Sequence, residues 1–275
     1  MNKNRSSLGS TLVACPYYLW AVIFVVVPVF VVIYYAFTDS NGGFTLGNVA
    51  ELKNYTDVFF ISIAYSLIAT VITLIIAYPF AYFISRKPAS TQRVMYMLVM
   101  LPQWMNLLIR TYSWMNILER NGIINNIVGA LGIEPLKMIG TPGAVIFGMI
   151  YNYLPYMILP IYTVMSKIDT SLLESAEDLG SNGFSKLRRV ILPLSVPGVI
   201  SGITMVFVPS VSTFYISQKL GGGKILLVGD AIERQIQMNY NYNLGAAMSL
   251  VLMIFILVSM AIVNRIGGDN EEIIM

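Results

Sequence analysis

The residue types that enzymes use most often for catalysis are scarce in this 275-residue sequence. Histidine is absent, and cysteine occurs once, as Cys15. The chain therefore lacks the usual general base and the commonest metal ligand, and it holds no disulfide scaffold. Its long apolar stretches contain no Asp or Glu that could act as an intramembrane acid or base. We expect no catalytic site and no metal site here.

The one glycine-rich segment that ends in lysine does not match a nucleotide-binding loop. Gly221-Gly222-Gly223-Lys224 is followed by Ile225 and lacks the Gly-x4-Gly-Lys-Ser/Thr spacing. That spacing lets backbone N–H groups surround the phosphates of ATP. The sequence therefore predicts that the chain does not itself bind ATP through a P-loop.

The composition indicates where the chain resides. Apolar residues make up 56% of the sequence and charged residues only 11%, with a mean hydropathy of +0.71. A soluble domain carries about 25% charged residues, so this chain has too few to cover a water-exposed surface. A net charge of +3 is too small to suggest a nucleic-acid partner. We predict a multi-pass protein whose spans lie in a lipid bilayer.

Six apolar stretches are long enough to cross the membrane as helices, which need about 20 residues each. Their continuous apolar character favours helices over barrel strands, which alternate. Five of the stretches lack charged residues, and the third is interrupted only by Arg110. We predict an all-α protein with one transmembrane domain over residues 1–275 and spans at about 12–37, 60–85, 95–116, 142–165, 195–217 and 244–264.

The distribution of Lys and Arg predicts the orientation. With the amino terminus in the cytoplasm, the inside segments hold ten basic residues and the outside segments six. By the positive-inside rule, both termini are expected to be cytoplasmic. The longest cytoplasmic loop is then 166–194.

The 166–194 loop carries a helix signal. Ser171 and Glu174 have the spacing of a capping box, and Gly180 is a typical helix terminator. Leu172, Ala176 and Leu179 share one face of the expected helix. A second short segment, about Phe184–Val190, is expected to end at Leu192-Pro193. Such an amphipathic helix either lies on the membrane or docks into a partner, and composition leaves both open.

The order of residues in this loop resembles the EAA loop of ABC-importer permeases, whose pattern is Glu-Ala-Ala, three residues, Gly, nine residues, Ile, any residue, Leu-Pro. Here Ser175 replaces the second-position Ala and Val190 replaces Ile, while the spacing is kept. The resemblance implies a coupling helix that docks on a separate ATPase subunit. The implied contact residues are Glu174, Ser175, Ala176, Gly180, Val190, Leu192 and Pro193.

Two further stretches are similar to spermidine/putrescine permeases, and most of all to their first (B-type) subunit. They are Leu101–Tyr112 and Phe214–Lys224, although at Gln218 the family pattern has an acidic residue. The resemblance implies the MetI-like permease fold, a place in the bacterial inner (cytoplasmic) membrane and a role in ATP-driven polyamine import. It also implies the partners: a second homologous permease, two ATPase subunits that bind ATP and Mg, and an extracytoplasmic polyamine-binding protein.

Aromatic side chains are the candidate ligands for a polyamine, because cations bind aromatic faces. The spans offer no carboxylate, so a strong acidic site would belong to a partner or to outer-loop residues such as Asp230 and Glu233. Tyrosines near membrane edges also serve as interface anchors, which leaves both roles open. The candidate pathway residues are Trp104, Tyr151, Tyr153, Tyr156, Phe214 and Tyr215.

Arg110 is the one charged residue inside a predicted span, and it lies toward the expected outer end. A charge at the bilayer centre costs about 2.5–3.5 kcal/mol on insertion scales. One interpretation is that Arg110 snorkels or pairs with an outer carboxylate such as Glu119. The other is a structural or gating role at the interface with the second permease.

Other functions fit the sequence less well. An ABC permease for another small solute, such as phosphate, sulfate or a sugar, is the nearest alternative. A proton-coupled carrier usually keeps an acidic residue or a histidine inside the membrane, and this chain has neither in its spans. Sodium coupling through carbonyl oxygens is left open. A membrane enzyme would need a nucleophile–base pair or a metal cluster that the sequence does not offer.

Overall fold

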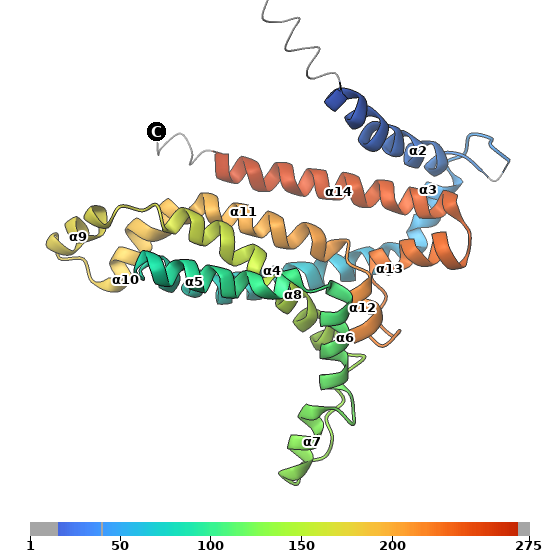
Figure 1. Cartoon of the computed structure of the whole chain (residues 1–275). Coiled ribbons are helices and arrows are strands. Elements are labelled where there is room, and N and C mark those ends of the chain that lie inside the picture. Colours follow the sequence, from blue (N-terminus) through green and yellow to red (C-terminus); the bar gives the residue numbers. More distant parts are fainter. Residues whose placement is uncertain (1–15, 40, 269–275) are drawn as a thin grey trace, which may run out of the picture. The chain divides into compact units, whose positions relative to one another are not determined.

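The computed structural model describes residues 16–39 and 41–268, which are almost entirely helical (Figure 1). Within these ranges there is no β-strand, and Thr38 and Phe44 form one isolated bridge. The all-α prediction is confirmed. The expected positions of both termini, and residues 12–15 of the first predicted span, lie outside the described residues. The chain divides into two compact units, Met1–Thr56 with Ile232–Ile254 and Asp57–Ala231 with Phe255–Met275.

The first unit packs the amino-terminal helices against the start of the last one. Ala36, Ala246, Ala247 and Leu250 form a buried apolar cluster in it. Gln235 Nε2 donates a hydrogen bond to the Tyr55 hydroxyl at 2.7 Å and ties the two segments of this unit together. Its helices are η1 (Val22–Val26), α2 (Val27–Ala36), α3 (Gly47–Glu51), η2 (Leu52–Tyr55), η5 (Arg234–Met238) and the first part of α14 (Tyr242–Gly268).

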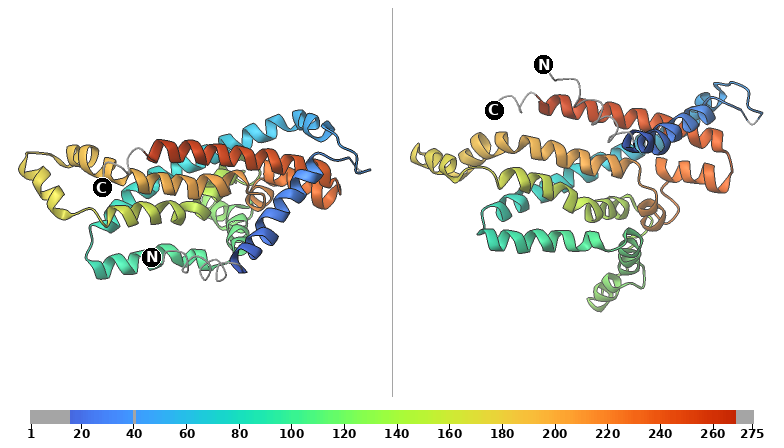
Figure 2. Two further views of the ribbon diagram at one scale, coloured as in Figure 1. Left: turned by 90° about the horizontal axis from the view of Figure 1, so that it is seen from above. Right: turned by 45° about the horizontal axis from the view of Figure 1, so that its top comes forward.

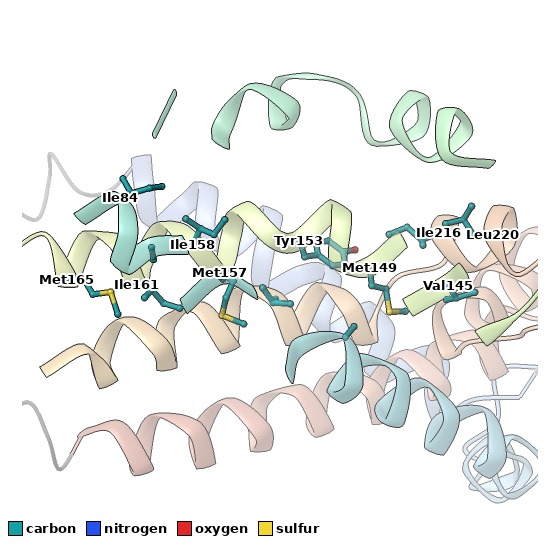
Figure 3. Packing of buried hydrophobic residues seen from close by; sticks show 14 of the residues in the cluster. Ile84, Val145, Met149, Tyr153, Met157, Ile158, Ile161, Met165, Ile216 and Leu220 are labelled. Atoms are coloured by element: carbon teal, nitrogen blue, oxygen red, sulfur yellow. The ribbon is translucent and has the colours of Figure 1, made fainter. Parts of the chain in front are cut away.

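The second unit is built around α8 (Pro142–Met165). Every fourth residue of this helix from Val145 to Met165 is buried, which forms one apolar stripe along its length (Figure 3). Residues at i and i+4 are neighbours on the helix surface, and each such step turns by about 40°, so the stripe winds gradually around α8. The other helices are α4 (Thr56–Ser85), α5 (Ala89–Met100), η3 (Leu101–Trp104), α6 (Leu107–Leu118), α7 (Ile123–Ala130), α9 (Thr170–Asp178), α10 (Gly183–Lys186), η4 (Leu187–Ile191), α11 (Leu192–Val211), α12 (Tyr215–Leu220) and α13 (Val228–Glu233).

Two glycines allow α11 to lie directly against α8. A Cβ on Gly198 would come within 2.8 Å of the Pro160 carbonyl oxygen, and one on Gly202 within 2.7 Å of Met157 Sδ. The two positions are separated by three residues, the spacing that lets membrane helices approach closely. Close packing is the main source of helix association in lipid, where both solvent and side chains are apolar.

Five helical segments are long and apolar enough to span a membrane. They are Pro16–Ala36, Gly47–Ser85, Pro142–Met165, Gly183–Val211 and Tyr242–Val263. The segment expected as a third span, 95–116, is divided into α5, η3 and α6, with extended backbone at Met105 and Asn106. The helix expected over 195–217 ends at Val211, and a separate short helix begins at Tyr215.

Two π-helical turns each precede a proline. Val22–Val26 comes before Pro28, and Leu187–Ile191 before Pro193. Proline lacks an N–H and its ring crowds the carbonyl four residues earlier, which lies inside the π turn in both cases. The wider turn therefore accommodates the proline and lets the helix continue.

Candidate functional site

The helix predicted in the 166–194 loop is present as α9, but its amino-terminal cap differs from the expected one. The Asp169 side chain accepts a hydrogen bond from the Ser171 backbone N–H at 3.0 Å, and the helix begins at Thr170. The predicted capping box between Ser171 and Glu174 is therefore wrong, because Ser171 already lies inside the helix. The hydrogen bonds from the Ser171 backbone and side chain lower the pKa of the Asp169 carboxyl.

The carboxyl end of α9 is the predicted one. Gly180 has φ +80°, and its N–H donates to the Glu177 carbonyl oxygen at 2.8 Å. Ser181 N–H donates to the Ala176 carbonyl oxygen at 3.0 Å, so the two bonds form a Schellman motif. A side chain at Gly180 would meet no atom within 4 Å, so only the backbone conformation requires glycine here.

The surface of α9 divides into an attached face and an open face. Leu173 is buried in the core of the second unit. Glu174 and Ser175 are exposed, Ala176 is partly buried, and Leu179 keeps 87% of its surface exposed. An ion pair between Lys186 of α10 and Glu177 closes the turn that follows α9. The predicted coupling residues of α9 therefore form an accessible surface on a helix with fixed ends.

The second half of the loop continues into the next span. We expected a short segment that ends at Leu192-Pro193, and that prediction is wrong because η4 carries the helix past Pro193 into α11. Val190 is partly buried, whereas Leu192 and Pro193 are exposed. These three residues thus belong to the first turns of a spanning helix.

The carboxyl end of α8, directly before the loop, is hydrogen-bonded to neighbouring segments. Arg86, in the turn after α4, donates from Nη2 to the Met165 carbonyl oxygen at 3.3 Å. Gln92 of α5 accepts a hydrogen bond from the Tyr162 hydroxyl at 2.9 Å and donates from Nε2 to the Lys87 carbonyl oxygen at 2.8 Å. These bonds fix the carboxyl end of α8, from which the loop starts, against α5 and the turn between α4 and α5.

A second group of predicted residues lies toward the other end of α8. Gly140 N–H donates to the Leu220 carbonyl oxygen at 2.9 Å, and Leu220 packs over Gly148. The views in Figure 2 likewise show α9 and α12 at opposite ends of α8. Since α8 has 24 residues, the two ends are separated by roughly 36 Å at 1.5 Å per residue.

Trp104 lies at the break between η3 and α6. Its side chain keeps 79% of its surface exposed. Asn106 begins α6 by accepting a hydrogen bond from the Leu108 backbone N–H at 2.7 Å. The cap and the preceding 3-10 turn explain why the apolar run does not form one continuous helix.

Arg110 is buried rather than directed to the membrane surface. Only 6% of it is exposed, and its Nη2 donates to Gln103 Oε1 at 3.2 Å. Nε and Nη1 have no hydrogen-bond partner among the described residues. Glu119 forms no ion pair with it in the described part of the chain. Neither snorkelling nor pairing with Glu119 is observed, and a structural or gating role at the interface with a second permease stays a prediction.

The aromatic candidates are not gathered into one site. Tyr151 packs edge-on against Trp114 of α6, with ring centroids 5.1 Å apart. Tyr153 is buried, and its hydroxyl donates to the Pro209 carbonyl oxygen at 3.3 Å. Tyr156 and Phe214 are exposed at 38% and 42% of their surfaces. Tyr215 lies beside Lys219, whose ammonium is 5.6 Å from the ring centroid.

In the part of the chain that the structure describes, no group of three or more His, Cys, Asp or Glu side chains could hold a metal ion. Residues 77–268 match the family model described as the inner membrane component of binding-protein-dependent transport systems. The chain belongs to this family. It is an ABC-transporter permease, a non-catalytic membrane subunit and a multi-pass protein of the bacterial inner membrane.

Curated permeases resemble this one over most of their length. The spermidine/putrescine transport system permease protein PotB of Haemophilus influenzae is 38% identical over 226 residues, which cover 78% of this chain and 79% of that protein. PotB of Escherichia coli K12 is 36% identical over 226 residues, or 78% of this chain and 82% of PotB. The inner membrane ABC transporter permease protein YdcU of the same strain is 28% identical over 193 residues, which cover 64% of this chain and 62% of YdcU.

Solved structures show the same fold. A chain from a bacterial ABC transporter involved in import of the acidic polysaccharide alginate superposes with a TM-score of 0.76 at 17% identity. The match covers 96% of each chain. A second alginate transporter structure, in complex with a periplasmic protein that holds an alginate pentasaccharide, gives a TM-score of 0.75 at 16% identity. It covers 96% of this permease and 94% of that chain. The predicted MetI-like permease fold is confirmed.

Sequence reasoning missed the partners of Arg110. Gln103 Nε2 donates to the Asn152 carbonyl oxygen at 2.9 Å, so it bridges Arg110 and α8. Asn152 is 1% exposed within an apolar helix. Gln103 bonds the backbone oxygen of Asn152, whose own side-chain Nδ2 donates to the Gly148 carbonyl oxygen at 2.9 Å. The amide side chain was therefore no signal for this contact. The Gly198–Gly202 spacing was a signal for the contact between α8 and α11.

Proposed function

We propose that this permease forms half of the membrane pathway of an ATP-driven polyamine importer. The observation that carries the proposal is the 36–38% identity to spermidine/putrescine permeases over 78% of the chain. The other half would come from a second, homologous permease. Two ATPase subunits would bind ATP and Mg, and an extracytoplasmic binding protein would deliver the polyamine.

In this proposal α9 is the coupling helix, and 166–194 faces the cytoplasm. Its open face, with Glu174, Ser175 and Leu179 exposed, is available to an ATPase subunit. The Schellman motif at Gly180 and the cap at Asp169 fix the length of the helix. Arg86 and Gln92 hold the carboxyl end of α8, from which α9 follows, against the turn after α4 and against α5. Movement of the ATPase would reach the pathway through this end of α8.

The pathway would be lined by aromatic side chains rather than by acidic ones in this subunit. Cation–π contacts contribute about 0.5–2 kcal/mol each, which suits a cargo that must bind and then leave. Trp104, Tyr156 and Phe214 are the exposed candidates, whereas Tyr153 is buried and supports the fold. Tyr151 and Tyr215 are partly buried beside Trp114 and Lys219.

Reconstitution of the complete transporter tests the proposal. The assembly in nanodiscs should hydrolyse ATP faster when the binding protein is loaded with spermidine than when it is empty. A matched preparation without this chain should show no stimulation. No response to spermidine or putrescine, with a strong response to phosphate, sulfate or a sugar, would assign the permease to another solute.

A further inference from the structure

The ammonium group of Lys219 lies between two tyrosines of the second unit. Its Nζ is 5.0 Å from the ring centroid of Tyr112 on α6 and 5.6 Å from that of Tyr215 on α12. It also donates to the Tyr112 hydroxyl at 3.5 Å. Both centroid distances fall within the range of about 6 Å over which a cation is attracted to an aromatic ring.

Lys219 makes no ion pair with any carboxylate in the described part of the chain. Its charge is therefore held by a hydroxyl and by two aromatic rings, which are the contacts that a ligand ammonium would use. Tyr112 keeps 44% of its surface exposed and Tyr215 is partly exposed, so a ligand could reach the rings.

We propose that Tyr112 and Tyr215 form an ammonium-binding subsite and that Lys219 occupies it as an internal competitor. The inference rests on the proposed function and adds to it a specificity device. An arriving ammonium group displaces the Lys219 side chain from the rings, and Lys219 then repels the bound polycation. Loading of the subsite is thereby weakened, which favours release of the cargo along the pathway.

Transport kinetics test the competition directly. Lys219→Met keeps most of the side-chain length and removes the charge, so the KM for spermidine uptake by the reconstituted transporter should fall about three- to tenfold. Lys224→Met is the matched control, since Lys224 is exposed and has the same charge five residues later. It should leave KM within about twofold. An unchanged or higher KM in Lys219→Met overturns the proposal, provided that the variant assembles normally.

A labelling experiment tests for the ammonium-binding subsite independently of whether spermidine is the cargo. Lys219 in the assembled transporter should be acetylated more slowly than Lys224 by a small N-hydroxysuccinimide ester, as read by mass spectrometry. Tyr112→Leu or added tetramethylammonium should each raise Lys219 acetylation severalfold. Lys219 reactivity equal to that of Lys224, or insensitive to both changes, contradicts the subsite. Absence of spermidine uptake together with the expected labelling contradicts only the proposed cargo.

Discussion

Arg110 donates a hydrogen bond to Gln103 across the break between η3 and α6, at 3.2 Å from Nη2 to Oε1. Gln103 in turn donates to the Asn152 carbonyl oxygen of α8. The two bonds hold the broken segment, with Trp104 exposed at its end, against the central helix of the second unit. Within this chain, the Arg110 side chain therefore links α6 to the irregular segment that precedes it.

Substitution of Gln103 tests whether these two hydrogen bonds stabilise the fold. Gln103→Leu leaves the buried guanidinium without its hydrogen-bond acceptor, so the free energy of unfolding in mixed micelles should fall by about 2 kcal/mol. The double variant with Arg110→Met should be more stable than Gln103→Leu alone, because both polar partners are gone. Gln237→Leu, at an exposed position, serves as the control. Additive effects of the two substitutions would show that the residues do not interact.

The sequence predicted the features that depend on local pattern. Continuous apolar runs gave the helical class, and Gly180 gave the end of α9, since a left-handed residue is required there. The position of the α9 cap depended on a competition between Asp169 and Ser171 that spacing alone does not decide.

Features that depend on tertiary contacts were not predictable in the same way. The break at Met105–Asn106 is stabilised by the hydrogen bonds of Gln103 with Arg110 and with α8, and the α8 partner, Asn152, is far from Gln103 in the sequence. Continuation of the helix through Pro193 required a π turn, which no periodicity in the sequence indicates. The aromatic pathway residues stay a prediction, because their roles depend on partner subunits.

The contact between α8 and α11 gives a second prediction. Gly198→Ala would place a Cβ 2.8 Å from the Pro160 oxygen and 3.0 Å from Ile161 Cα, and these backbone atoms cannot move aside alone. The unfolding free energy should fall by about 1–3 kcal/mol, as in other overpacked sites. Gly183→Ala is the control because its Cβ would meet no atom within 4 Å. Equal unfolding free energies for the two variants would show that α8 and α11 can move apart without loss of stability.

The end of α9 gives a third prediction. Gly180→Val forces a β-branched residue into φ +80° at a cost of about 1–2 kcal/mol, so the last turn of α9 should rearrange. Membrane insertion should persist, while co-purification of the ATPase and spermidine-stimulated ATP hydrolysis should both decrease. Gly180→Asn should retain most of both, because asparagine tolerates this conformation. Normal coupling in Gly180→Val would remove α9 from the proposed mechanism.

The cap of α9 gives a prediction about pH. The pKa of Asp169 is lower in the folded protein than in the unfolded chain, so its ionised form stabilises the helix above about pH 4. That contribution is lost as the pH falls through the depressed folded-state value. Hydrogen-exchange protection of the Ser171 amide, corrected for the intrinsic rate, should therefore decrease below about pH 4. Asp169→Asn still caps the helix but does not titrate, so its protection should stay constant over the same range.

Uptake by proteoliposomes tests the central claim most directly, because the permease is proposed to depend on a motor in another subunit. Vesicles that contain both permeases, the ATPase and the loaded binding protein should accumulate labelled spermidine only when the ATPase can reach ATP. Vesicles that lack the ATPase should show no accumulation above the empty-vesicle background. Equal accumulation with and without the ATPase would contradict the account and would indicate a carrier that works on its own.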